Sequence, residues 1–234
     1  MTSNPSNFKP ATPQLKLTAD GSHTLVLDHI AESYHSDAGA LTESIHVYIE
    51  QGLLTYTAPG PLHVLEVGLG TGMNAVLTCY YADLLGRPIY YQSLEPYPVP
   101  EPILSQVQMG KFTQKPEYKA WLQTIHNARH NEPVALHPHF EFTVFHEPVQ
   151  DFPMNPSRYD IIYYDAFAPS KQPEMWSLAL LTQCVNALKP GGIFITYCAN
   201  GQFKRNLKGL GMTLFNPPGI GPRRQITRAV KPMS

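Results

Sequence analysis

The sequence predicts an α/β fold built on a mostly parallel sheet. Short apolar runs with strand character alternate along the chain with helical segments, the order that gives parallel strands joined by right-handed crossovers. One run ends in a glycine-rich turn and another ends on a single acid. Open α/β sheets place their binding groups at such carboxyl ends of strands. The 234 residues suit one domain with an additional element.

The N-terminal part is predicted to form a hairpin and a helix that precede the sheet. Residues 16–28 alternate between polar and apolar around Asp20-Gly21, a dipeptide typical of hairpin turns. A polar loop follows, and residues 40–51 have helical character up to Gly52. We therefore expect an extension over residues 1–61 and a sheet domain over residues 62–234, forming one structural unit.

The sheet domain is predicted to contain seven strands, of which the last two form an antiparallel hairpin around NPPGIGP. The strands are expected at residues 62–67, 89–95, 140–145, 160–165, 189–198, 212–216 and 224–230. The helices between them are expected at residues 73–85, 103–110, 116–130, 175–188 and 201–208.

The glycine-rich turn follows the first of these strands, in LEVGLGTG. Glycines at 68, 70 and 72 let a ligand approach the backbone closely. A dinucleotide fingerprint, G-x-G-x-x-G, would need a glycine where the chain has Met73, and no Lys-Ser/Thr pair marks a phosphate-binding P-loop. The pattern is E-x-G-x-G-x-G, starting at Glu66, and it resembles motif I of class I S-adenosylmethionine-dependent methyltransferases. The alternative interpretation is that these glycines only shape a turn and bind no ligand.

Two further positions suggest contacts to a nucleoside. Glu95 ends the second strand, where an acid can accept hydrogen bonds from both hydroxyls of an adenosine ribose and would repel a ribose phosphate. The segment FHEPVQDF after the third strand is expected to contact the adenine amino group, with Glu147 and Asp151 as candidates.

The acid at the end of the fourth strand is Asp165, followed by Ala-Phe-Ala-Pro. With Phe167 beside it, the loop offers a charge and a flat apolar surface together. The alternative is an aspartate that caps the following turn.

Charge is distributed unevenly along the chain, although the net charge is only −1. The last acid is Glu174, and eight cations follow it, so the first 174 residues carry −9. Such asymmetry is expected where a polyanion docks on one face. The alternative interpretation is that these side chains are individually solvated and point in different directions, so that they form no common surface. The eight cations are Lys189, Lys204, Arg205, Lys208, Arg223, Arg224, Arg228 and Lys231.

Other patterns exclude several classes of protein. The chain has no run of about 18 apolar residues that would span a membrane, and its polar, proline-rich start lacks the apolar core of a signal peptide. Three scattered cysteines indicate core thiols in a reducing cytoplasm. The cysteines and the ten histidines form no metal-binding motif. His126 and His130 lie four apart on a predicted helix, where a polar surface is favoured over a pair of metal ligands, so we expect no metal site.

Several blocks together resemble one family, the methyltransferase domain of MnmC-type tRNA wobble-uridine enzymes. In chain order they are ESYHSDAGALTES, LEVGLGTGMN, SLEPYP, YDIIYYDAFAPSKQPEMW, LKPGGIFITYCANGQFKRNL and GIGPRRQ. The resemblance covers about residues 15–229, and DAFAP with the downstream PEMW is its most specific part. It implies a class I, Rossmann-like methyltransferase fold with a seven-stranded, mostly parallel sheet.

The resemblance also implies an activity. The family transfers a methyl group from S-adenosylmethionine to the exocyclic amine of 5-aminomethyl-2-thiouridine at the tRNA wobble position. Many members are fused to a flavin-dependent oxidase domain. Because this chain ends at Ser234, we expect a stand-alone methyltransferase that acts on the anticodon loop and receives its amine from a separate enzyme.

The motifs and the resemblance together predict the residues of the site. Asp165 is expected to orient the neutral amine and, secondarily, to accept a proton, while Phe167 and Tyr34 stack on the uracil. One departure affects the adenine contact, because Glu147-Pro148 falls where members of the family commonly have Gly-Asp. The residues expected to bind the cofactor are Glu66, Gly68, Gly70, Gly72, Glu95 and Glu147, and those expected to bind substrate or tRNA are Tyr34, His35, Lys204, Arg205, Arg223 and Arg224.

Three other functions remain open at the level of sequence. A methyltransferase of a small amine would share the fold but leave the basic C-terminal quarter without a partner. An aminopropyltransferase uses a related sheet, but its glycine loop is typically rich in consecutive Gly and Asp, unlike GLGTG. A catalytically silent RNA-binding module would not need the glycine loop, Glu95 and Asp165 together.

Overall fold

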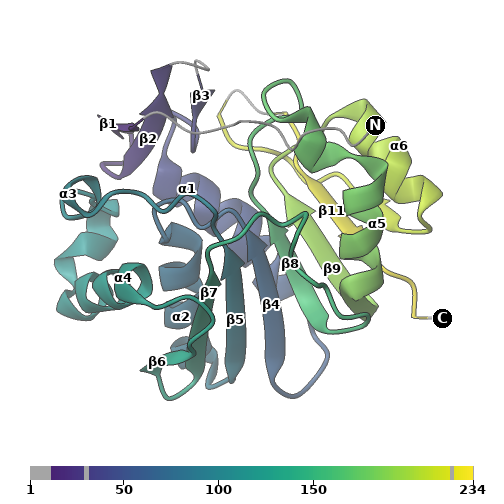
Figure 1. Ribbon diagram of the computed structural model, residues 1–234, viewed down its shortest axis with the longest axis horizontal. Coiled ribbons are helices and arrows are strands. Elements are labelled where there is room, and N and C mark those ends of the chain that lie inside the picture. The colour runs from purple at the N-terminus through teal and green to yellow at the C-terminus, as the bar shows by residue number, and fades with distance from the viewer. Residues whose placement is uncertain (1–11, 29–31, 222–223, 234) are drawn as a thin grey trace.

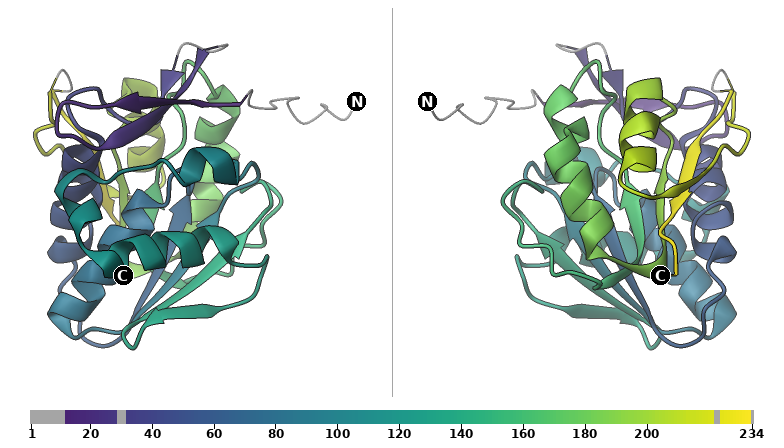
Figure 2. Two further views of the ribbon diagram at one scale, coloured as in Figure 1. Left: turned by 90° about the vertical axis from the view of Figure 1, so that its left-hand side faces the viewer. Right: turned by 90° about the vertical axis from the view of Figure 1, so that its right-hand side faces the viewer.

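The computed structural model describes residues 12–28, 32–221 and 224–233. An eight-stranded sheet carries helices on both faces, and a small three-stranded sheet lies across one of its ends (Figures 1 and 2). Within the described residues, no helix combines the length and the apolar character that a membrane crossing requires.

The large sheet has the strand order β10-β11-β9-β8-β4-β5-β7-β6. Its five central strands are parallel: β4 (Leu62–Val67), β5 (Ile89–Leu94), β7 (Phe140–Phe145), β8 (Tyr159–Tyr164) and β9 (Leu188–Thr196). The chain winds outward from β4 in both directions, so the switch point of the topology lies between β4 and β8. In open sheets of this kind the ligand binds at that point, beyond the carboxyl ends of the strands.

The predicted fold class is confirmed, with one strand more than expected. The C-terminal hairpin is present as β10 (Thr213–Phe215) and β11 (Thr227–Val230), and β11 pairs antiparallel with β9. The additional strand is β6 (Val134–His137), which pairs antiparallel with β7 through an irregular register. It is short and lies between two prolines, and such a segment has little of the alternation that marks a strand.

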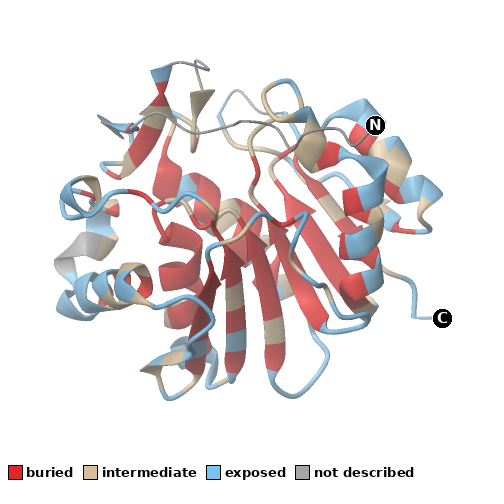
Figure 3. Cartoon of the chain, viewed as in Figure 1, coloured by how far each residue is buried: buried red, intermediate tan, exposed pale blue. Residues whose placement is uncertain are grey.

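Helices cover both faces of the sheet and create two separate cores. Consecutive strand residues point to opposite faces, so Val64 and Tyr163 join one core, while Leu65 and Tyr164 join the other. The strands between the two cores are almost entirely buried (Figure 3). The first core packs under α2 (Met73–Leu85) and α4 (Pro116–Asn127), and the second under α5 (Leu178–Ala187) and α6 (Gly201–Gly209).

The helical segments follow the predictions with shifted ends. The long insert holds a short helix α3 (Glu101–Leu104), which begins two residues and ends six residues before the expected helix, and a 3-10 turn over Gly110–Gln114 ahead of α4. Another 3-10 turn, Pro173–Trp176, precedes α5. Ser177 separates the two because its hydroxyl accepts a hydrogen bond from the Leu180 amide and caps α5.

The N-terminal extension forms the predicted hairpin and helix. The strands β1 (Gln14–Leu17) and β2 (His23–Leu27) pair around Asp20-Gly21, and a two-residue strand β3 (Glu32–Ser33) joins β2. Helix α1 (Ala40–Ser44) continues directly as a π-helix over Ile45–Glu50, and a 3-10 turn follows at Leu53–Thr55. The division at residue 61 stays a prediction.

Candidate active site

A cavity of about 520 Å³ lies at the carboxyl ends of β4, β5 and β8. Its floor is the glycine loop, and Glu95, Asp165 and Phe167 stand around it. Tyr34 and His35 reach it from the N-terminal extension, which lies over this end of the sheet (Figure 1). The volume falls within the range of about 300–1,000 Å³ that is typical of ligand pockets.

The glycine loop is shaped by two glycines at which a side chain would not fit. Gly68 and Gly70 have φ values of +93° and +53°, a region that L-residues rarely adopt. A β-carbon on Gly68 would lie 2.7 Å from the carbonyl oxygen of Asp165, and one on Gly70 would lie 3.0 Å from the ring of Tyr34. The third glycine, Gly72, faces α4 instead of the cavity. It therefore serves the packing of the loop.

Glu95 is fixed at the tip of β5 by the backbone around it. Its two carboxylate oxygens accept hydrogen bonds from the amides of Gly70 (3.1 Å) and Tyr97 (2.9 Å). Burial raises the pKa of Glu95, and these two amides act in the opposite direction. Because each carboxylate oxygen can accept a second hydrogen bond, Glu95 can still receive a pair of hydroxyl groups from the cavity.

Two acids predicted to bind the cofactor do not line the cavity. Glu66 is fully buried within the sheet, where the Ser93 hydroxyl donates to it at 2.8 Å, and burial raises its pKa to about 8. Glu147 is partly exposed and lies outside the cavity lining. Asp151, the second acid considered for the adenine contact, does line the cavity.

Asp165 follows directly on β8 and is held by its neighbours. Its amide donates to the carbonyl of Val67 at 2.9 Å, and the side-chain amide of Asn74 donates to its Oδ2 at 3.0 Å. Burial raises the pKa of Asp165 to about 6, although Tyr48 and Asn74 favour its ionised form. Asp165 is thus a stronger base than an ordinary aspartate.

The loop after Asp165 is anchored by aromatic side chains. The indole of Trp176 donates to the carbonyl of Phe167 at 2.7 Å, and the Tyr197 hydroxyl donates to the carbonyl of Ala166 at 2.8 Å. The ring of Phe167 meets Tyr34 edge to face, with centroids 5.1 Å apart. The DAFAP and PEMW blocks therefore form one structural unit that presents a flat apolar wall beside the acid.

The extension places Tyr34 and His35 through its second strand. The amide of Tyr34 donates to the Leu25 carbonyl at 2.8 Å, and the amide of His35 donates to the Thr24 hydroxyl at 2.9 Å. Burial raises the pKa of Tyr34, and the nearby Glu95 raises it further. Both side chains are therefore fixed parts of the cavity wall.

Three of the four cations predicted to contact tRNA are described by the structure, and these three lie outside the cavity. Lys204 and Arg205 are on α6, and Arg224 lines a shallow hollow together with Gln225, which accepts a hydrogen bond from Lys204 at 3.4 Å. Tyr197 lines both this hollow and the cavity, so the two adjoin. Arg223 lies outside the described residues.

Part of the basic C-terminal quarter has structural partners. Lys189 pairs with Asp160 at 2.7 Å, and Lys231 donates to the carbonyl of Leu188 at 2.6 Å just beyond α5. These cations hold the sheet and a helix end, so they do not belong to a docking surface.

One group of possible metal ligands exists among the described residues, far from the cavity. Ligand atoms of Asp83, in the last turn of α2, of His137, at the end of β6, and of His139 lie within 4.8 Å of one another. However, Nδ1 of His137 accepts a hydrogen bond from the His139 amide at 3.3 Å, which leaves the proton on Nε2, the atom that faces Asp83 at 3.2 Å. This is the arrangement of a histidine bonded to an aspartate.

Several residues of the cavity wall were not predicted from the sequence, among them Gln172, Glu174 and Tyr197. Gln172 and Glu174 flank the start of the Pro173–Trp176 turn, and Tyr197 directly follows β9. A signal for Tyr197 existed, since it ends a buried strand next to the one that delivers Asp165.

Comparison with known proteins agrees with this geometry. Residues 113–232, just over half of the chain, match a family described as S-adenosyl-L-methionine-dependent methyltransferase. The tRNA 5-methylaminomethyl-2-thiouridine biosynthesis bifunctional protein MnmC of Pseudomonas entomophila is 30% identical, over 81% of this chain and 31% of that protein. The MnmC of Magnetococcus marinus is also 30% identical, over 84% of this chain and 31% of that protein. The chain thus spans about a third of the length of these relatives.

Among solved structures, that of MnmC2 from Aquifex aeolicus shares the fold. It matches with a TM-score of 0.71 and 23% identity, over 95% of this chain and 73% of the other. With the family match and the cavity at the switch point of the sheet, the chain belongs to the S-adenosyl-L-methionine-dependent methyltransferases, and S-adenosylmethionine is the cofactor that this family implies.

Proposed function

We propose that the protein methylates the exocyclic amine of 5-aminomethyl-2-thiouridine at the wobble position of tRNA. The observation that carries the proposal is Asp165, a carboxylate of raised pKa that stands between the glycine loop and the aromatic wall of Phe167 and Tyr34. The names of the relatives, which refer to biosynthesis of the methylated nucleoside, point to the same reaction.

The cofactor side of the cavity fits S-adenosylmethionine. Gly68 and Gly70 line the cavity without side chains, so a ligand can approach their backbone closely, and Glu95 can accept the two ribose hydroxyls. The segment from Pro148 to Asp151 lines the cavity where the adenine is expected. When bound, the cofactor supplies an electrophilic methyl group on a sulfonium sulfur.

The acceptor side has to deliver a neutral amine, because an ammonium group has no lone pair. Asp165 orients the amine and accepts its proton, which then passes to solvent as the methylated amine leaves. Burial raises the pKa of Asp165 to about 6, and the apolar wall lowers the pKa of the amine by desolvating its cation. Both effects reduce the difference in pKa between the protonated amine and Asp165, so the proton transfer becomes less unfavourable. Alignment of the amine supplies up to roughly 7–11 kcal/mol of the barrier reduction.

The wobble base and the phosphate backbone of the tRNA contact different parts of the protein. The wobble base lies in a single-stranded loop, so it can turn into the cavity without breaking a base pair. There the ring of Phe167 stacks on the base, and Tyr34, which is nearly perpendicular to that ring, contacts it from the side. Lys204, Arg205 and Arg224 lie outside the cavity mouth, where they bind phosphates of the anticodon loop.

The test is methylation of bulk tRNA from cells that lack the methylated nucleoside, with labelled S-adenosylmethionine and nucleoside analysis. We expect label in 5-methylaminomethyl-2-thiouridine and none after Asp165→Asn. Wild-type protein that binds the cofactor but leaves this nucleoside unlabelled would refute the proposal. Label in a small amine or in a polyamine would support a small-amine methyltransferase or an aminopropyltransferase-like enzyme instead.

A further inference from the structure

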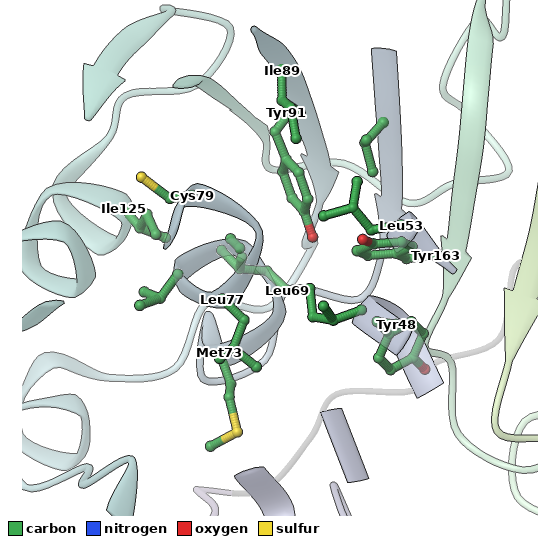
Figure 4. Close-up of a cluster of buried hydrophobic side chains, with 14 of the residues drawn as sticks. Tyr48, Leu53, Leu69, Met73, Leu77, Cys79, Ile89, Tyr91, Ile125 and Tyr163 are labelled. Atoms are coloured by element: carbon green, nitrogen blue, oxygen red, sulfur yellow. The ribbon is translucent and has the colours of Figure 1, made fainter. Parts of the chain in front are cut away.

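A group of buried polar side chains lies beneath Asp165, on the face of the sheet that α2 covers. Asn74 is in the first turn of α2, and Tyr48 belongs to the π-helix of the extension. Each member is at most 3% exposed, and Tyr48 and Tyr91 lie among the apolar side chains of the first core (Figure 4). The members of this polar group are Tyr48, Glu66, Asn74, Tyr91 and Ser93.

The polar group is tied to the active site through Asn74. Its amide nitrogen donates to Oδ2 of Asp165 at 3.0 Å, and Tyr48 also favours the ionised form of that carboxyl group. At the other end, Ser93 donates to Oε2 of Glu66 at 2.8 Å. Asn74 and Tyr91 both stabilise the ionised form of Glu66, so they lie beside it. Asn74 is therefore between the two acids.

Four oxygen atoms of the polar group have no hydrogen-bond partner among the described residues. They are Glu66 Oε1, Asn74 Oδ1 and the hydroxyls of Tyr48 and Tyr91. A buried polar atom left unpaired costs about 1–3 kcal/mol. With Glu66 ionised, Glu66 Oε1 and Asn74 Oδ1 are both acceptors, and a proton on Glu66 adds a donor to the group.

We propose that Asn74 is a positioning residue for methyl transfer, which aims the carboxylate of Asp165 at the amine and is itself oriented by Glu66. The inference rests on the proposed function, in which Asp165 receives the amine. The amide nitrogen of Asn74 carries two N–H groups, so it can face Glu66 and donate to Asp165 at the same time. The reverse orientation would set Oδ1 against a carboxylate. The raised pKa of Glu66, about 8, agrees with a proton there at neutral pH.

Tyr48 gives the extension a part in this arrangement. The π-helix that carries it is a rare form, and single π-turns are frequent at functional sites. Its wider turn brings the Tyr48 ring against Tyr163, with centroids 5.1 Å apart, at the strand that ends on Asp165. Asp165 thus receives support from α2 and from the extension.

The first test measures Asp165 itself, without any substrate. Carboxyl 13C NMR of the full chain, compared with Asp165→Asn for assignment, gives its pKa. Both Asn74→Leu and Tyr48→Phe remove a neutral group that favours the ionised form, so the pKa should rise above its wild-type value in each. Thr78→Val is the matched control, since Thr78 is equally buried one turn further along α2 and should leave that pKa unchanged.

The second test measures the rate of methyl transfer against pH. In Asn74→Leu we expect kcat to fall about ten- to a hundredfold, KM for S-adenosylmethionine to stay within about threefold, and the midpoint of the pH profile to rise with the pKa of Asp165. An unchanged pKa and pH midpoint in Tyr48→Phe and Asn74→Leu would overturn the inference. If Asn74→Leu does not fold, Asn74→Ser, which also removes the amide donor, takes its place in both measurements.

Different results would refute the proposed function and the positioning role of Asn74. Wild-type protein without activity on tRNA would overturn the assigned acceptor, whereas the NMR titration would still show whether Asn74 and Tyr48 hold Asp165.

Discussion

Gly68 and Asp165 are packed so closely that a β-carbon on Gly68 would lie 2.7 Å from the Asp165 carbonyl oxygen. The contact joins the cofactor loop, which follows β4, to the acceptor loop, which follows β8. The Asp165 amide reinforces it by donating to the carbonyl of Val67 at 2.9 Å. A substitution in the cofactor loop should therefore also displace the acceptor loop.

Gly68→Ala should impair both sides of the site. The φ of +93° costs an alanine about 1–3 kcal/mol, and the collision with Asp165 displaces the acceptor loop as well. We expect the affinity for S-adenosylmethionine to fall about tenfold or more and kcat to fall with it, measured by calorimetry and by initial rates.

Gly60→Ala is the matched control for this substitution. Gly60 has a nearly equal φ of +91°, but nothing lies within 4 Å of a β-carbon there. It should lose stability through backbone strain alone and keep its cofactor affinity. Equal losses of affinity in the two variants would show that the contact with Asp165 is unimportant.

Trp176→Phe tests the anchor of the acceptor loop. The substitution keeps a ring in the core but removes the indole N–H that donates to the Phe167 carbonyl at 2.7 Å. Loss of a hydrogen bond costs about 0.5–1.5 kcal/mol net, and without this anchor the loop can shift. We expect kcat to fall more than cofactor affinity, with a lower melting temperature.

The chain has only two tryptophans, so Trp121→Phe is the natural control. Trp121 lies on α4 and does not line the cavity, and its replacement should leave kcat near the wild-type value. It also makes Trp176 the only source of tryptophan fluorescence. A kcat for Trp176→Phe equal to that of Trp121→Phe would mean that the indole hydrogen bond does not set the loop.

Arg224→Ala tests the proposed tRNA surface. If Arg224 binds a phosphate, its loss should weaken tRNA binding across sequences and reduce the slope of log K against log salt by about 1. Lys119→Ala removes the same charge from the exposed face of α4 and should leave the slope unchanged. Filter binding at several salt concentrations gives both slopes, and equal slopes would remove Arg224 from the interface.

The sequence predicted the parts of the site that follow directly from strand order. Glu95 and Asp165 each follow a buried strand, and the carboxyl ends of neighbouring parallel strands meet at one edge. Their meeting with the glycine loop was therefore predictable, and so was an aromatic wall from Phe167.

What escaped prediction depends on which way a side chain points. Glu66 and Val67 are neighbours on β4, yet Val67 lines the cavity while Glu66 faces α2. A glycine-loop motif names the acid without its orientation. Likewise, the hydrogen bond from Asn74 to Asp165 depends on a contact between elements distant in the chain, which no local pattern contains.

The buried acid Glu66 should make stability depend on pH. In the folded protein its pKa is about 8, against an ordinary value of 4.5. Between these values the unfolded chain binds fewer protons than the folded one, so the free energy of unfolding falls as pH rises through this window. Each pH unit within it costs about 1.4 kcal/mol. Below about pH 4.5 the contribution of Glu66 is fully present.

Glu66→Gln should remove this dependence, because glutamine is neutral at every pH and nearly isosteric. Urea unfolding of both proteins from pH 5 to pH 8 isolates the effect, since all other titrating groups are shared. We expect the free energy of unfolding of the glutamine variant, relative to that of the wild type, to increase as pH rises. Because a neutral group replaces a neutral group at pH 7, its affinity for S-adenosylmethionine should hardly change there. Parallel stability curves together with a large loss of cofactor affinity would instead mean that Glu66 is ionised and binds the cofactor, as the glycine-loop motif first suggested.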